Sequence, residues 1–303
     1  MTSSSPPTPT TLHATELHQQ RPRSSLPFPP EAVAAFSCRG VTVNPRSGRA
    51  TPKTNQDRGC VCASFGGDPK RTLFCVFDGH GSAGDQVAQY VVENLPQQLA
   101  EHPSLREDPG QSLHETFVAI DDALRKDKAI STKFSGTTAT VCLCLQEADG
   151  VLIHSANAGD SRAILVASGQ AIDLTDDHKP DRESERERIT GTGGHVSAAN
   201  AETGAVARVW LDGSEQLPGL AVARSLGDHV ASRVGVYAEP EVTTRRVACR
   251  PGDEVTLVLG SDGVFESRRM VEHMPAPNGS QHRLRGGSHG AGRSCGTASG
   301  ERG

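Results

Sequence analysis

Three short aspartate-containing turns each stand at the end of a run of β-forming residues. They are residues 78–81 (Asp-Gly-His-Gly), 159–162 (Gly-Asp-Ser-Arg) and 261–263 (Ser-Asp-Gly). Residues 73–77, which precede the first turn, are all apolar, as is typical of a buried strand. Because strand ends meet at one rim of a sheet, we expect these acidic side chains, together with Asp57, to share a site.

Clustered carboxylates repel one another, and without a cation this repulsion raises their pKa values and weakens the fold. Oxygen ligands with few accompanying His or Cys side chains favour Mg²⁺ or Mn²⁺ over zinc. Gly79 follows the first aspartate, Asp78, and because it has no side chain its carbonyl can turn toward an ion. One Asp-Gly pair alone usually forms only a turn, but three such turns at strand ends favour a divalent-cation site.

Several other kinds of site find no support in the sequence. A calcium-binding EF-hand beginning at Asp78 would need a glutamate at its last position, where the chain has Gln89. The glycine-rich phosphate-binding motif of nucleotide enzymes does not occur. A formal net charge of −5, with no basic segment in the middle of the chain, argues against nucleic-acid binding. No apolar run reaches the roughly 18 residues of a membrane-spanning helix, so we expect no membrane partner.

The eight cysteines do not form a zinc-binding pattern. Cys60 and Cys62 are two positions apart, as are Cys142 and Cys144, and in a strand this spacing puts both side chains of a pair on one face. We expect reduced, half-buried cysteines, and hence a cytoplasmic or nuclear protein. Residues 1–35 lack the apolar core of a secretory signal, but their many Ser and Thr residues and few acidic ones leave organelle targeting open.

Composition divides the chain into three parts. Residues 1–35 are rich in Ser, Thr and Pro, and residues 267–303 consist mostly of Gly, Ser, Arg and His. We expect both segments to be disordered, because they cannot bury enough apolar surface to offset chain entropy. Residues 36–266 hold most of the apolar side chains and are expected to form one folded domain.

Hydrophobic periodicity predicts two helices followed by mainly antiparallel strands. Val87, Val91 and Leu95 recur at helical spacing after Gly84, and Pro96 is expected to end or kink this helix. The remaining predicted elements are a helix over 112–129, a meander of strands over 138–145, 151–156 and 162–166 with a hairpin turn at 149–150, a charged surface helix over 182–189 and a strand over 254–259. This order predicts an α+β fold with helices packed on antiparallel sheets.

Seven segments, in the same order, resemble the motifs of type 2C metal-dependent protein serine/threonine phosphatases. They are residues 54–57 (Thr-Asn-Gln-Asp), 76–81 (Val-Phe-Asp-Gly-His-Gly), 135–139 (Ser-Gly-Thr-Thr-Ala), 157–162 (Asn-Ala-Gly-Asp-Ser-Arg), 177–180 (Asp-His-Lys-Pro), 220–228 (Leu-Ala-Val-Ala-Arg-Ser-Leu-Gly-Asp) and 260–266 (Gly-Ser-Asp-Gly-Val-Phe-Glu). The resemblance implies a four-layer α/β/β/α sandwich of two antiparallel sheets flanked by helices. It also implies hydrolysis of phosphoserine and phosphothreonine by a water that two Mg²⁺ or Mn²⁺ ions activate, with a weaker third ion.

The resemblance assigns metal ligands as well. By the family pattern Asp78 bridges the two ions, Gly79 gives its carbonyl to one of them, and Asp262 binds the other. Gln56 and Asp57 occupy the position of the family's acidic pair, which acts largely through metal-bound water, and Asp57 would thereby serve both the metals and catalysis. Asp160 matches the aspartate associated with the weaker third ion.

His80 and Lys53 would act on the substrate. An imidazole with a reference pKa of about 6.5 suits His80 to be the general acid that protonates the leaving alkoxide, although in isolation a histidine in a loop is more often structural. Many family members bind the substrate phosphate with an arginine, but this sequence has Pro52 at that position. Lys53 is adjacent and could supply a point charge without the two-pronged geometry of arginine.

The other motif segments are expected to be scaffold. Hydroxyl groups of residues 135–138 would bond the metal-binding carboxylates from below. Arg162 would pair with a nearby carboxylate. Residues 177–180 and 224–228 would shape a flap at residues 191–210, which would select protein substrates.

One departure from the family keeps two functions open. The family has a further metal-binding aspartate near its C-terminal end, whereas no aspartate follows Asp262 here. The sequence therefore resembles a family member without that end, and its metal site would be short of one carboxylate. It could be an active phosphatase, or a pseudo-phosphatase or regulatory binding module with the same fold. We expect phosphorylated protein substrates as partners, and a monomer.

Overall fold

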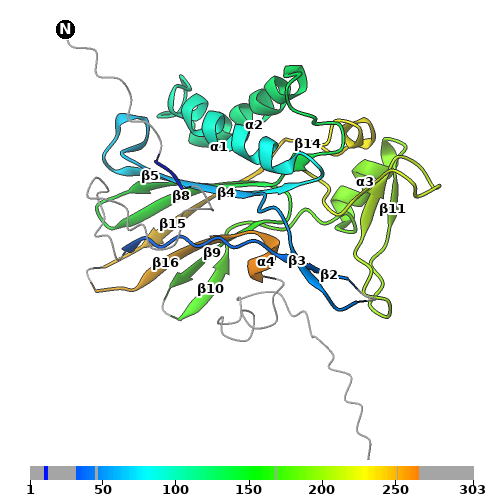
Figure 1. Cartoon of the computed structure of the whole chain (residues 1–303). Coiled ribbons are helices and arrows are strands. Elements are labelled where there is room, and N and C mark those ends of the chain that lie inside the picture. Colours follow the sequence, from blue (N-terminus) through cyan, green and yellow to red (C-terminus); the bar gives the residue numbers. More distant parts are fainter. Residues whose placement is uncertain (1–9, 13–31, 45–46, 168, 251, 266–303) are drawn as a thin grey trace, which may run out of the picture.

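The computed structural model describes residues 10–12, 32–44, 47–167, 169–250 and 252–265 of the chain. Two long helices lie on the outer face of a large antiparallel sheet, and a smaller antiparallel sheet packs against the other face (Figure 1). The expected α+β sandwich of antiparallel sheets with helices on the outside is confirmed.

The large sheet has its strands in the order β1-β4-β5-β7-β8-β15, and every neighbouring pair is antiparallel. The strands are β1 (Thr10–Leu12), β4 (Asp57–Ala63), β5 (Arg71–His80), β7 (Ala139–Gln146), β8 (Gly150–Ala158) and β15 (Glu241–Ala248), with short additions β6 (Gly136–Thr137) and β14 (Leu226–Gly227) beside β5. The predicted hairpin turn at 149–150 is confirmed, since β7 and β8 pair directly across it.

Helices α1 (Gly84–Ala100) and α2 (Pro109–Lys126) cover this sheet. Pro96 was predicted to end or kink α1; it does not end the helix, which runs on to Ala100 with Pro96 and Leu99 buried. Their burial offsets the one helical hydrogen bond that proline cannot make. Helix α2 begins before residue 112 because the Asp108 carboxylate accepts a hydrogen bond from the backbone N–H of Gln111, a capping arrangement that favours proline at the first helical position.

The smaller sheet corrects the predicted meander. Its strands are β10 (Gln170–Asp173), β9 (Arg162–Ala167) and β16 (Val255–Gly260), in that order. β9 therefore does not pair with β8; the chain crosses from one sheet to the other at residues 159–161, and Asp160 lies on this crossing. Side chains of both sheets, among them Ile153 and Leu165, form the core between the layers.

Smaller elements lie outside the strands of the two main sheets. They are the hairpin β2 (Val41–Val43) and β3 (Ala50–Pro52), the 3₁₀ turns at Phe65–Gly67 and Ala231–Val234, helix α3 (Glu183–Gly191), the flap strands β11 (His195–Ser197), β12 (Arg208–Trp210) and β13 (Pro218–Leu220), and the short helix α4 (Asp262–Phe265). Helix α3 is a charged and mostly exposed helix as predicted, and it turns Glu185 and Ile189 into the interior, where both are fully buried. The flap sheet also extends beyond the predicted 191–210.

The chain ends were predicted to be disordered. Thr10–Leu12 of the N-terminal arm form β1 and pair with β4, so the arm contributes one strand to the large sheet. The predicted tail, 267–303, lies outside the described residues.

No helix among the described residues has the length and apolar character needed to cross a membrane. The seven cysteines of the described segments are all free thiols.

Candidate active site

Asp57 and Asp78 form the centre of the predicted acidic site. Asp57 is the first residue of β4 and stands directly opposite Asp78, near the end of β5, in the antiparallel register. Burial, followed by repulsion from Asp57 and Asp262, raises the pKa of Asp78 to about 8. Burial also raises the pKa of Asp57, while hydrogen bonds from Asp78 and Ser261 oppose the rise. Two neighbouring carboxyl groups of this kind favour binding of a cation, because its charge compensates their mutual repulsion.

Asp262 and Asp160 approach this pair from the smaller sheet. Asp262 begins α4 directly after β16, and Asp160 occupies the crossing between β8 and β9. Both add to the negative field at Asp78. Asp160 is also held by Lys179, whose ammonium lies 2.6 Å from its Oδ2 atom. Burial raises the pKa of Asp160, and Lys179 opposes that rise.

The donor chemistry of these residues fits Mg²⁺ or Mn²⁺. All four side chains offer hard oxygen atoms, and burial raises the pKa values of Asp57, Asp78 and Asp160. Within the described part of the chain, no three His, Cys, Asp or Glu side chains enclose a metal-sized space by themselves. An ion held here would therefore keep water among its ligands, as Mg²⁺ usually does.

Gly79 is required by close packing beside Asp78. A Cβ atom at this position would lie 2.3 Å from the Gly84 carbonyl oxygen and 2.7 Å from that of Gln56. Any side chain would thus push α1 or the start of β4 away from the acidic pair. The Gln56 side chain holds the next turn by donating to the Gly81 carbonyl at 2.8 Å.

His80 ends β5 next to the carboxylates. Its Nε2 atom lies 2.5 Å from Oδ2 of the buried Asp228. Burial lowers the pKa of His80, but the charge and hydrogen bond of Asp228 outweigh burial and bring the pKa to about 9. The imidazole is therefore held in its protonated form at neutral pH.

The segment at 135–138 lies below the site as predicted, but its hydroxyl groups bond other partners. Thr138 Oγ1 accepts a hydrogen bond from the backbone N–H of Asp78 at 3.0 Å, not from its carboxyl group. Ser135 Oγ accepts from the N–H of Ala83. These bonds fix the backbone around Asp78. The predicted pairing of Arg162 is confirmed, since its guanidinium binds both carboxylate oxygens of Asp177 at 3.0 and 2.7 Å.

Comparison with known proteins places this geometry in a family. The family model described as "Protein phosphatase 2C" matches residues 43–270. The chain belongs to the protein phosphatase 2C family. It is 34% identical over 235 residues to "Probable protein phosphatase 2C 35" of Arabidopsis thaliana, covering 71% of this chain and 65% of that protein. It is 33% identical to "Protein phosphatase 2C homolog 2" of Schizosaccharomyces pombe, covering 72% and 57%. The chain thus spans about two thirds or less of these relatives' lengths.

Solved structures of the protein phosphatase 2C family share the fold. A serine-threonine phosphatase 2C from Toxoplasma gondii superposes with a TM-score of 0.59 at 23% identity, over 75% of this chain and 78% of that one. A sex-determining protein of C. elegans superposes with a TM-score of 0.56 at 24% identity, over 71% and 50%. At these identities the likeness supports the sandwich fold alone.

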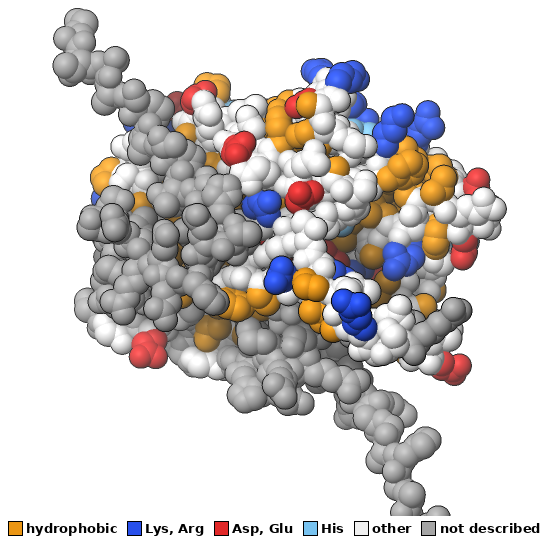
Figure 2. Space-filling view, in the orientation of Figure 1, with side chains coloured by type: hydrophobic (Ala, Val, Ile, Leu, Met, Phe, Trp, Pro, Cys, Tyr) orange, Lys and Arg blue, Asp and Glu red, His pale blue; other side chains and the backbone are white. Residues whose placement is uncertain are grey.

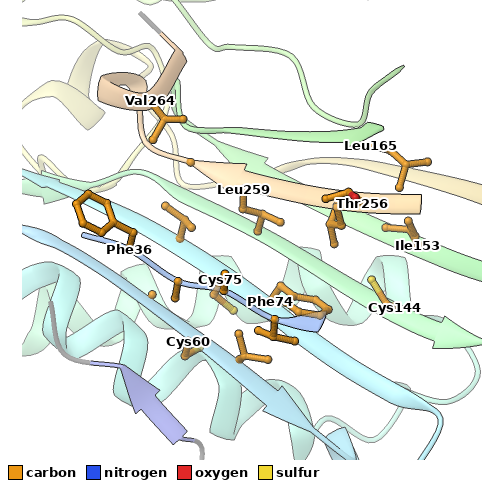
Figure 3. Close-up of a pocket in the computed structure, with 18 of the residues that line it drawn as sticks. Phe36, Cys60, Phe74, Cys75, Cys144, Ile153, Leu165, Thr256, Leu259 and Val264 are labelled. Carbon is orange, nitrogen blue, oxygen red and sulfur yellow. The ribbon is translucent and has the colours of Figure 1, made fainter. Parts of the chain in front are cut away.

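An apolar cavity lies beside the acidic site of this family member. It has a volume of about 540 Å³ and opens between the two sheets, where residues such as Phe36, Phe74 and Leu259 line it (Figure 3). Asp57 and Ser261 line it as well.

Lys53 is the predicted site residue that no described contact joins to the carboxylates. It follows β3, is exposed, and its backbone N–H donates to the Gly40 carbonyl. On the face shown in Figure 2, Lys and Arg side chains are scattered among acidic and apolar ones.

Sequence reasoning missed Asp228 and Lys179 as residues of the site. Both lie in segments that were expected to be scaffold only. Asp228 is 3% exposed. A buried carboxylate requires a charged or hydrogen-bonded partner, but the sequence does not show which partner it finds.

Proposed function

We propose that this chain is a metal-dependent protein phosphatase that hydrolyses phosphoserine and phosphothreonine in phosphorylated proteins, with two Mg²⁺ or Mn²⁺ ions and a weaker third. The observation that carries the proposal is the opposed pair Asp57 and Asp78, whose raised pKa values mark an uncompensated negative site at the strand ends. Membership of the protein phosphatase 2C family supports the same chemistry.

The residues that would hold the ions are Asp78, the Gly79 carbonyl, Asp262 and Asp57, with Asp160 at the weaker position. When bound, the ions would supply a nucleophilic water at neutral pH and neutralise the charge of the phosphoryl oxygens. No serine or cysteine nucleophile is then needed. The chain's own part is to hold the carboxylates at the required separation on two adjacent strands.

His80 would complete the reaction. The oxygen of a serine or threonine side chain leaves poorly as an alkoxide, so a proton must reach it as the phosphorus–oxygen bond breaks. His80 stands next to the acidic pair and is protonated at neutral pH because of Asp228. Lys53 would add a positive charge for the substrate phosphate, and the flap would contact the surrounding protein substrate. We expect the monomer to suffice, since all these residues belong to one chain.

The test is hydrolysis of a phosphoserine peptide by the purified chain with increasing Mn²⁺. We expect metal-dependent phosphate release that Asp78→Ala and Asp262→Ala each reduce by at least about 10²-fold. Asp122→Asn, an exposed carboxylate on α2, is the matched control and should retain full activity. Absence of release at every Mn²⁺ concentration would refute the enzyme; phosphopeptide binding measured by calorimetry would then identify a regulatory binding module.

A further inference from the structure

The buried side chain of Asp228 is held against one end of the His80 imidazole. It follows β14, and its Oδ2 atom meets both His80 Nε2 at 2.5 Å and the Ser225 hydroxyl, which donates to it at 2.7 Å. The Asp228 side chain is 4% exposed, whereas 27% of the His80 side chain is exposed. One end of the imidazole is thus anchored in the protein while the ring stays accessible.

Backbone hydrogen bonds also hold the turn at Asp228. The backbone N–H of Asp228 donates to the Ser135 carbonyl at 3.0 Å, and its carbonyl accepts from Ala231 and Ser232 at 2.7 and 3.2 Å. Asp228 also has a φ of 46°, a left-handed conformation that costs energy for any residue except glycine. The hydrogen bonds of the carboxylate go to Ser225 within this turn and to the distant His80.

Gly136 makes the contact possible. Strand β6 lies between β14 and β5, and Gly136 is the register partner of both Gly227 and His80. A Cβ atom at Gly136 would lie 2.2 Å from Asp228 Oδ2. Because Gly136 has no side chain, the Asp228 carboxylate can pass over β6 and contact the His80 imidazole at the end of β5.

We propose that Asp228 is a positioning residue for His80: it fixes the imidazole through Nε2 so that Nδ1 faces the leaving oxygen of the phosphoester. The inference rests on the proposed function. Among the described residues Nε2 bonds only Asp228, and Nδ1 makes no protein hydrogen bond. In the reaction the water oxygen bonds to phosphorus, the phosphorus–oxygen ester bond breaks, and the Nδ1 proton passes to the leaving oxygen. The proton released by the water balances the one that His80 gives up.

The test compares two substrates that differ in their need for a proton. A phosphoserine peptide releases an alkoxide, whereas p-nitrophenyl phosphate releases a stable phenolate that needs no acid. We expect Asp228→Asn to lower kcat on the peptide about 10²-fold and kcat on p-nitrophenyl phosphate less than about 3-fold. His80→Gln should show the same selectivity. The double variant should be no slower on the peptide than His80→Gln alone, because the two residues act as one unit.

Two further variants separate positioning from general damage. Gly136→Ala should displace the carboxylate and reproduce the selective loss. Asp121→Asn is the matched control: Asp121 is another carboxylate bonded to a histidine, His229, and it supports the same turn through the Gly227 N–H at 2.7 Å. It should leave the ratio of the two rates unchanged. Equal losses on both substrates in Asp228→Asn, or multiplying losses in the double variant, would overturn the proposal.

A spectroscopic measurement keeps this test apart from that of the proposed function. In proton NMR the Nε2–H of His80 should give a far-downfield signal that is lost in both Asp228→Asn and His80→Gln and kept in Asp121→Asn. If the wild-type chain hydrolyses neither substrate, the proposed function fails, yet this signal still decides the positioning. A signal that persists in Asp228→Asn would refute it.

Discussion

Asp57 and Asp78 stand opposite each other in adjacent antiparallel strands, and both carboxyl groups are buried and hold their protons more tightly than usual. Like charges directly across a strand pair destabilise a sheet. The two opposed carboxyl groups therefore destabilise the strand ends unless a cation binds between them. If the proposed ions bind at this pair, we expect their binding to stabilise the fold.

Asp78→Asn should stabilise the metal-free chain and abolish its response to metal. The amide removes a carboxyl group whose ionised form is costly, but it is a poor ligand. For the wild-type chain, Mn²⁺ at a hundred times its dissociation constant should add about 2.7 kcal/mol, which raises Tm by roughly 5–10 °C. Thermal scanning with Mn²⁺ and with EDTA measures both effects. The exposed Asp122→Asn should behave as wild type, and a metal response that survives in Asp78→Asn would contradict the assignment.

The metal-free chain should lose stability as the pH rises. The pKa of Asp78 is raised from 3.8 to about 8, so its favourable contribution is complete below pH 3.8 and is lost as the pH rises through 8. The pKa of His80 is raised from 6.5 to about 9, so its contribution is lost over a window that ends near pH 9. Urea unfolding in EDTA between pH 5 and pH 9 should show a steady fall. Asp78→Asn should flatten the curve below pH 8, and an unchanged slope would refute the role of this carboxyl group.

The local sequence predicts much of the fold. The apolar run at 73–77 and the helical spacing of Val87, Val91 and Leu95 each specify an element without reference to distant residues. The crossing at Asp160 could not be predicted, because β9 pairs with β16, which lies far along the chain. Local patterns show that a strand exists, while the choice of its partner depends on the whole domain.

The candidate site divides in the same way. Asp78, Asp160 and Asp262, which are proposed to bind metal, could be found because each stands in a turn next to a predicted strand. The pair His80 and Asp228 could not be found, since 148 positions separate them. Lys179 was missed for a similar reason: whether a lysine is solvated or paired depends on which carboxylate the fold brings to it.

Lys53→Ala tests the weakest-supported member of the site. If Lys53 supplies a positive charge to the substrate phosphate, its removal should raise KM for a phosphopeptide about 5-fold and leave kcat unchanged. An exposed ion pair contributes up to about 1 kcal/mol, which corresponds to this factor. Lys70→Ala, at another exposed lysine, is the control. An unchanged KM would exclude a role for Lys53 in phosphate binding.

Glu185→Gln should destabilise the chain strongly although Glu185 lies far from the reacting groups in the sequence. Its side chain is fully buried, with Arg188 and Arg224 each 2.7 Å away. Burial alone would raise the pKa of Glu185, but the two guanidinium groups lower it to about 2, so its contribution is present above pH 4.5 and is lost as the pH falls through 2. Removing the charge leaves two arginines without their partner, at a cost of about 3–5 kcal/mol.

Glu183 on the same helix provides the matched comparison for this prediction. Its ion pair with Arg186 is exposed on both sides, so Glu183→Gln should cost less than about 1 kcal/mol. Urea unfolding at pH 7 measures both variants. Because Arg188 also donates to the carbonyl groups of Ala223 and Gly235, loss of Glu185 should loosen the segment that leads to Asp228. Hydrogen exchange should therefore rise at residues 223–235 in Glu185→Gln and not in Glu183→Gln. Equal effects of the two substitutions would show that burial of the Glu185 ion pairs does not anchor this segment.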